Sequence, residues 1–285
     1  MKTILTFVGG GERDAVILQT ALAAASPLAA HLDCLHAHVP AMQAARYART
    51  EFASGAALGK ALDRLKIDSD SCSGLAADNV RAFCAAAGIE LCEAPGDPCG
   101  VTASFREEES NELDRLTLHA SQRDLVVMGR ARQKQGLAPD TLEHLVRHSG
   151  RPILVAASTA PPQLTETVMV CWKDPSSSAA AVAAATPFLA RARRVVFVSI
   201  AKHDNGLTDA MGAIAREAGV VEPEISIVAP SRGGIPATLA TAAEQCAADL
   251  VVLGAYGRSR AREIFFGSCT DLLLEGTDRP ILLMH

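Results

Sequence analysis

The sequence predicts an α/β protein built from two tandem doubly wound domains, each a mainly parallel sheet flanked by helices. Short apolar runs alternate with helical patterns along the whole chain, which is typical of such a sheet. The second half also repeats the first: DLVVMG at 124–129 returns as DLVVLG at 249–254, and RPIL at 151–154 returns at 279–282. We expect one domain over residues 1–158 and another over 165–285, joined by the proline-containing segment 157–166.

Composition narrows the class of protein. The chain has 285 residues, of which 49% are hydrophobic and 21% charged, and its net charge of −5 argues against nucleic-acid binding. No apolar run approaches the roughly 20 residues that span a bilayer, and the N-terminus is read as a first strand rather than a signal peptide. The 8 cysteines form no CxxC pair. We therefore expect reduced thiols and a cytoplasmic protein without membrane partners.

Each copy divides into alternating strands and helices. In the first copy the expected strands are Thr3–Val8, His31–Val39, Ile89–Ala94, Leu125–Met128 and Ile153–Ala156. The expected helices there are Asp14–Ala30, Ala41–Leu65 (broken near Ser54), Asn79–Ala87, Glu107–Ser121 and Asp140–Arg147, with a loop at Pro95–Gly100. In the second copy the expected strands are Thr167–Trp172, Arg194–Ile200, Glu224–Val228, Leu250–Leu253 and Ile281–Met284. Its expected helices are Ser176–Arg191, Thr208–Ala218, Pro236–Ala247 and one that includes Thr270–Leu274.

A glycine-containing loop follows the fourth strand of the second copy. Gly254 ends that strand, Gly257 follows, and Gly267 and Ser268 stand nine residues further on at the start of a helical pattern. Glycines let the backbone approach a ligand closely, and the first amides of a helix lack intrahelical partners and attract anions. The stretch therefore predicts a phosphate-binding loop, although glycines needed only for the path of the loop are the alternative.

The corresponding stretch of the first copy lacks these features. Arg132 stands in place of Gly257, and Pro139 and Asp140 stand in place of Gly267 and Ser268. Asp140 and Glu143 are spaced as a capping box, which would occupy the helix amides with negative charge. We therefore expect a phosphorylated ligand in the second copy and not in the first.

The pattern Gly254-x2-Gly257-x9-Gly267-Ser268, between an apolar strand and a Pro-Ile-Leu-Leu strand, resembles the ATP-binding motif of the universal stress protein family, and the whole chain resembles its tandem form. The resemblance implies five strands per domain in the order 3-2-1-4-5, with ATP at the switch point between the first and fourth strands. It also implies that the two copies associate through their last strands, and it allows a homodimer. The residues implied to meet the nucleotide are Gly254, Gly257, Arg258, Gly267, Ser268, Cys269 and Thr270, with Trp172, Lys173 and Ile200 near the adenine.

The expected role is ATP binding in a stress-related regulatory or sensing protein rather than catalysis. The chain has no GxSxG, HExxH or GxxxxGK[ST] motif. Lys173 stands where the family often has an acid or amide, and it is an alternative phosphate ligand, as are Arg258, Arg260 and Arg262. The alternatives for the whole chain are a stress scaffold that binds no nucleotide and a slow ATP hydrolase.

Two further motifs lie in the first copy. Gly9–Gly11 is read as a tight turn after the first strand, with a phosphate loop as the alternative. Cys34, His36 and His38 alternate along one strand and so share a face, where they are read as core residues. The alternative is a zinc site completed by His31 or His119.

Overall fold

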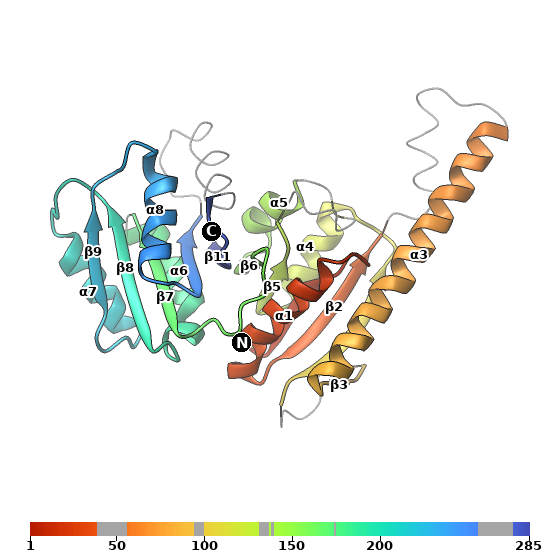
Figure 1. Ribbon diagram of the computed structural model, residues 1–285, viewed down its shortest axis with the longest axis horizontal. Helices are drawn as coiled ribbons and strands as arrows, with labels where there is room; N and C mark the ends of the chain where they lie inside the picture. The colour runs from red at the N-terminus through yellow and green to blue at the C-terminus, as the bar shows by residue number, and fades with distance from the viewer. Residues whose placement is uncertain (39–55, 94–99, 131–136, 138–139, 174, 256–275) are drawn as a thin grey trace.

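The computed structural model describes residues 1–38, 56–93, 100–130, 137, 140–173, 175–255 and 276–285. Its centre is one 11-stranded sheet in the order β3-β4-β2-β1-β5-β6-β11-β10-β7-β8-β9. The first six strands in this order come from the N-terminal half of the chain and the last five from the C-terminal half (Figure 1). The two predicted copies of an α/β domain are thus present, and their sheets are joined edge to edge.

The C-terminal half has the predicted topology. Its strands are β7 (Thr167–Trp172), β8 (Arg194–Ile200), β9 (Glu224–Val228), β10 (Leu250–Gly254) and β11 (Ile281–Met284). All the pairings among them are parallel, in the order β9-β8-β7-β10-β11. This is the order 3-2-1-4-5, so the predicted arrangement is confirmed.

The N-terminal half contains one strand more than predicted. Its strands are β1 (Thr3–Phe7), β2 (His31–Ala37), β3 (Glu90–Leu91), β4 (Thr102–Glu108), β5 (Leu125–Met128) and β6 (Ile153–Val155). The expected third strand, 89–94, supplies only the two-residue edge strand β3, whereas β4 lies beside β2 in the third-strand position. The prediction of a helix from Glu107 was wrong, because Thr102–Glu108 pairs with the whole of β2 and the helix α4 covers only Leu113–Ser121.

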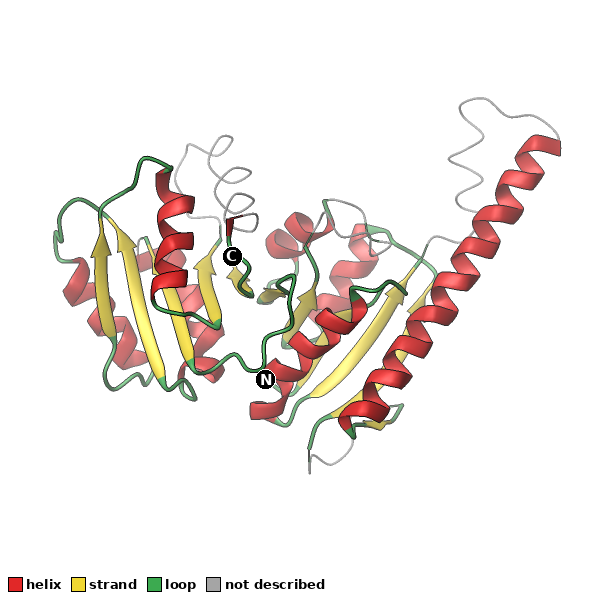
Figure 2. Ribbon diagram, in the orientation of Figure 1, coloured by secondary structure: helices red, strands yellow, loops and turns green. Residues whose placement is uncertain are grey.

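The helices flank the sheet on both sides (Figure 2). Besides α4, they are α1 (Asp14–Ala25, followed by the 3₁₀ turn Ser26–Leu28), α3 (Ala56–Ala87), α5 (Thr141–His148), α6 (Pro175–Leu189), α7 (Leu207–Glu217) and α8 (Gly234–Gln245). The separate helical pieces predicted over 41–65 and 79–87 are corrected to one helix of 32 residues from Ala56. No proline interrupts it, and the serine and aspartate residues near its middle do not end it. The N-terminal part of α3 projects beyond the sheet (Figure 1).

Two apolar layers fill the space between the sheet and its helices. One layer contains side chains from α1, α3, α6 and α7, and the other contains side chains from α4, α5 and α8. Each layer includes residues of both halves of the chain, because alternate strand residues face opposite sides of one continuous sheet. Among the described residues, no helix is long and apolar enough to cross a membrane.

The two halves join through their last strands, as predicted. β6 and β11 pair antiparallel, with Ile153 opposite Leu283, Leu154 opposite Leu282, and Val155 opposite Ile281. Arg130, which follows β5, adds polar contacts across this junction: its Nη2 donates to the carbonyl oxygens of Thr277 (2.8 Å) and Arg279 (3.2 Å). The copies therefore form one unit related by an approximate twofold axis at the β6–β11 pair.

Candidate functional site

The candidate site lies at the carboxyl ends of three adjacent strands of the C-terminal sheet. β7 lies between β8 and β10, and the chain runs from β7 outward to β8 and β9 before it returns to β10. This reversal makes the β7–β10 boundary the topological switch point, where open α/β sheets bind ligands. Trp172 ends β7, Gly254 ends β10 and Ile200 ends β8, so the structure brings these three predicted residues to one edge.

Trp172 and Ile200 lie on opposite faces of that edge. Trp172 is only 4% exposed and packs in the layer under α6 and α7, while Ile200 packs against the layer under α8. The buried indole Nε1 of Trp172 has no hydrogen-bond partner among the described residues. Because an indole N–H is only a donor, Trp172 offers one unused hydrogen bond to an acceptor at this edge.

Lys173 directly follows β7 and its side chain is exposed. Its backbone N–H donates to Ser178 Oγ (3.1 Å), and Ser178 is buried near the start of α6. The sequence analysis missed Ser178. Its neutral hydroxyl bonds the first amide after the strand, so it brings no negative charge to the site.

The remaining predicted site residues lie outside the described residues. They are Gly257, Arg258, Gly267, Ser268, Cys269 and Thr270, together with the alternative phosphate ligands Arg260 and Arg262. Before this segment, Ala255 donates its N–H to Met284 O (2.6 Å), and after it Thr277 is buried. The segment that carries the glycine motif therefore begins at the carboxyl ends of β10 and β11.

At the equivalent edge of the first copy, a carboxylate bonds the backbone amides that follow the first strand. Thr3 and Thr167 begin equivalent strands, because each donates its backbone N–H to an equivalent carboxylate, Asp124 (3.0 Å) and Asp249 (2.8 Å) respectively. Counting from these threonines, Asp14 corresponds to Ser178.

Asp14 is buried, and its carboxylate accepts hydrogen bonds from the N–H groups of Gly9 (2.9 Å) and Gly10 (2.8 Å) and from Asn79 Nδ2 (3.1 Å). Gly9–Gly11 is therefore the predicted tight turn. The N–H groups of Gly9 and Gly10 are occupied by a negative side chain that would repel a phosphate, which argues against the alternative of a phosphate loop.

The proposed capping box at α5 is absent. Asp140 precedes the helix in a helical conformation and makes no side-chain cap hydrogen bond. Glu143 instead pairs with Arg147 one turn later, at 2.9 Å. The capping prediction was wrong because an N-cap residue needs extended backbone angles, whereas Asp140 has φ −87° and ψ −2°. Arg132 and Pro139 lie outside the described residues.

The zinc alternative does not fit the two completing histidines proposed for it. His31 faces the side of β2 opposite to Cys34 and His36, and its ring nitrogens contact Thr102 Oγ1 (2.8 Å) and Ser104 Oγ (2.9 Å). His119 Nε2 contacts Glu108 Oε2 at 2.6 Å. Burial raises the pKa of the Cys34 thiol, with smaller contributions from Cys84, Asp33 and Asp14, so the thiolate that metals prefer is disfavoured.

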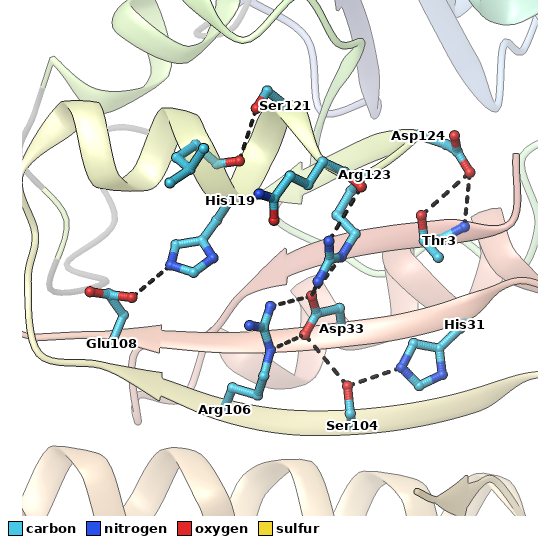
Figure 3. Close-up of polar contacts among 12 residues, drawn as sticks. Thr3, His31, Asp33, Ser104, Arg106, Glu108, His119, Ser121, Arg123 and Asp124 are labelled. Atoms are coloured by element: carbon cyan, nitrogen blue, oxygen red, sulfur yellow. Dashed lines mark hydrogen bonds and ion pairs between the residues drawn. The ribbon is translucent and has the colours of Figure 1, made fainter. Parts of the chain in front are cut away.

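A buried carboxylate with two arginines holds the additional strand β4 in place (Figure 3). The Asp33 side chain is 3% exposed and accepts hydrogen bonds from Arg106 Nε (2.9 Å) on β4 and from Arg123 Nε (2.7 Å), which follows α4. Ser104 Oγ joins Asp33 to His31. This cluster was not predicted, and its hydrogen bonds tie β2, β4 and the start of β5 together, which indicates a structural role.

The cluster shifts the acidity of its members. Burial by itself raises the pKa of Asp33, but the hydrogen bonds and charges of Arg106 and Arg123 outweigh it and hold the pKa below its ordinary value. Burial lowers the pKa of His31; Asp33 opposes this shift, and the positive charges of Arg123 and Arg106 add to it. At neutral pH Asp33 is therefore an anion beside two cations, and His31 is neutral.

Taken together, the fold and the edge at β7 and β10 define a tandem doubly wound α/β protein. A hydroxyl, that of Ser178, bonds the amide after the first strand of the second copy, and a carboxylate, that of Asp14, bonds the equivalent amide of the first. Comparison with known proteins agrees. The family model described as "Universal stress protein family" matches residues 165–285. The C-terminal domain belongs to that family, and the N-terminal domain repeats its fold, which gives the chain the tandem form.

Solved structures show the same two-domain fold over the full chain. A universal stress protein from Archaeoglobus fulgidus DSM 4304 has a TM-score of 0.69 at 12% identity, covering 99% of this chain and 97% of that one. A functionally unknown protein from Pseudomonas aeruginosa PAO1 has a TM-score of 0.56 at 14% identity, covering 100% and 92% respectively. At these identities the similarity establishes the fold. No protein with a curated description matches the chain.

Proposed function

We propose that the C-terminal domain binds ATP or a closely related nucleotide, and that the chain acts in a stress response as a regulatory or sensing protein rather than as an enzyme. The observation that carries the proposal is the position of the glycine motif. It begins with Gly254 at the end of β10, beside β7, at the switch point of a sheet with the order 3-2-1-4-5.

The contrast between the two copies supports the same assignment. In the second copy the amide after the first strand is bonded by the hydroxyl of Ser178, whereas in the first copy the equivalent amide is bonded by the carboxylate of Asp14. A negative carboxylate at this edge repels phosphates, and a hydroxyl does not. The first domain then serves as a structural partner that shares the sheet.

A reciprocal exchange between the copies tests the proposal. Ser268→Asp places the residue of the first copy in the glycine motif, and Asp140→Ser makes the reverse change as the matched control. Isothermal calorimetry with ATP should show binding by the wild type and by Asp140→Ser, with binding lost in Ser268→Asp because a carboxylate meets the phosphates. If the wild type releases no heat and shows no binding with ATP, the proposal is wrong.

Two further measurements sharpen this test. Trp172 is the single tryptophan of the chain, so a change in selectively excited tryptophan fluorescence on adding ATP reports on the surroundings of this residue. Phosphate release by the wild type should not exceed that of Ser268→Ala. Phosphate release well above that of Ser268→Ala would show that the protein hydrolyses ATP slowly, which would contradict a role in binding alone.

A further inference from the structure

A pair of histidines lies on the partly exposed side of α5. His144 and His148 are one helical turn apart, with ring centres separated by 4.5 Å and ring planes at 46°. Leu142, Leu145 and Val146 occupy the buried side of the same helix. The core contacts of α5 therefore fix the helix that carries the two imidazoles, with His144 partly exposed and His148 exposed to solvent.

We propose that His144 and His148 form a binding site for a divalent first-row transition metal ion, of the class of Ni²⁺, Cu²⁺ or Zn²⁺. Imidazole nitrogen is a preferred ligand of these ions. A metal–nitrogen bond of about 2.0–2.1 Å puts the ion roughly 3.2 Å from each ring centre, so two rings 4.5 Å apart subtend an angle of about 90° at a shared ion. This angle suits two adjacent positions of an octahedral or distorted tetrahedral ion.

The site has two protein ligands. Within the described parts of the chain no group of three or more His, Cys, Asp or Glu side chains could hold a metal ion. Water then fills the other coordination positions, which an exposed helix face permits.

The charges around the pair do not oppose a cation. Arg147 is the nearest cation on the helix and is paired with Glu143 at 2.9 Å. His285, at the end of the C-terminal half, also lies near His148 and Arg147.

The pair belongs to the first copy alone. The residues 128 positions later, on the same part of the repeat, are Leu272 and Gly276, which bind no metal. In the first copy the proposed ligands therefore lie a few residues after Pro139 and Asp140, the counterparts of Gly267 and Ser268. The inference does not depend on nucleotide binding.

Calorimetric titration of the full chain with Ni²⁺ tests the site. We expect one Ni²⁺ per chain, weakened at least tenfold by His144→Gln and by His148→Gln, since glutamine keeps the size and polarity but not the imidazole. His203→Gln, at an exposed histidine of the C-terminal half, is the matched control and should bind as the wild type does. Cu²⁺ should bind more tightly than Ni²⁺ to the same two histidines.

The melting temperature gives a second readout. An ion that joins residues one turn apart binds the folded helix only, so Ni²⁺ should raise the melting temperature of the wild type and not that of His148→Gln. The proposal is overturned if Ni²⁺ does not bind, or if both variants bind it like the wild type. It is also overturned if only His36→Gln weakens binding, because His36 stacks on His38 with ring centres 5.6 Å apart and would then be the site.

Discussion

Leu154 and Leu282 are the same residue of the repeated sequence, and they face each other across the antiparallel pair of β6 and β11. Both are fully buried in the layer under α1 and α6. A residue opposite its own counterpart marks the local twofold axis, which here passes between these two side chains. The junction of the domains is therefore a self-complementary contact of the kind that joins identical subunits, made within one chain.

Truncation of these leucines should show that they act as a pair. Leu154→Ala and Leu282→Ala should each lower the free energy of unfolding by about 2–4 kcal/mol, because each leaves a cavity in a closed layer. Since directly opposed side chains contact each other, the double variant should deviate from additivity by at least about 0.5 kcal/mol in urea unfolding. Leu282→Ala with Leu32→Ala is the control: Leu32 is on β2, several strands from β11, and those two losses should add.

The strands of the second copy could be predicted almost to the residue. β7, β8, β9 and β11 have the predicted bounds. β7, β8 and β11 are nearly continuous apolar runs, as is typical of parallel strands covered on both faces, whereas β9 is a partly exposed edge strand with β-branched residues. β4 could not be predicted in this way. The acidic residues from Glu107 onward suggested the start of a helix, whereas Arg106 on the same strand is bonded in the sheet by Asp33, 73 residues away. A local pattern contains no information about such a partner.

Some residues of the candidate site could likewise be predicted from local patterns, and others could not. The strand ends fixed the positions of Trp172, Ile200 and Gly254, since the ends of parallel strands meet at one edge. Asp14 and Ser178 were not predicted, although they stand at equivalent places of the repeat. Their roles depend on a turn that brings a side chain back to the amide five residues earlier, and no local sequence pattern indicates this contact.

The turn at Gly10 should not tolerate a side chain. Gly10 has φ +79°, and a Cβ there would lie 2.3 Å from the carbonyl oxygen of Cys72 on α3. Gly219 also has φ +79° but has no atom within 4 Å of such a Cβ, so it is a matched control for the backbone angle alone. Gly219→Ala should lower the free energy of unfolding by about 1 kcal/mol, and Gly10→Ala by at least about 2 kcal/mol more, because α3 must move. Equal losses in chemical denaturation would show that α3 does not pack on this turn.

Removal of the Asp33 charge should loosen β4 from the sheet. Asp33→Asn should lower the free energy of unfolding by about 2–4 kcal/mol at pH 7, since it takes the charged partner from two arginines that are only partly exposed. Asp78→Asn, which breaks the exposed pair with Arg81, should have little effect.

Because the pKa of Asp33 is lowered from 3.8, the contribution of this carboxylate to stability is present above that pH and is lost as the pH falls further. The gap between wild type and Asp33→Asn should therefore narrow below about pH 3.8 and stay constant near neutrality.

His31 should make the stability of the chain depend on pH in a milder range. Its pKa is lowered from 6.5 in the folded chain, so as the pH falls through 6.5 the unfolded chain takes up a proton that the folded chain does not. The free energy of unfolding should consequently fall from pH 7.5 to 5.5 in the wild type, and fall less in His31→Gln, which cannot titrate. Urea unfolding at several pH values measures both slopes. Leu154→Ala serves as the control: it is destabilised yet retains His31, so its slope should match that of the wild type. A His31→Gln slope as steep as the wild-type slope would mean that another group carries the dependence.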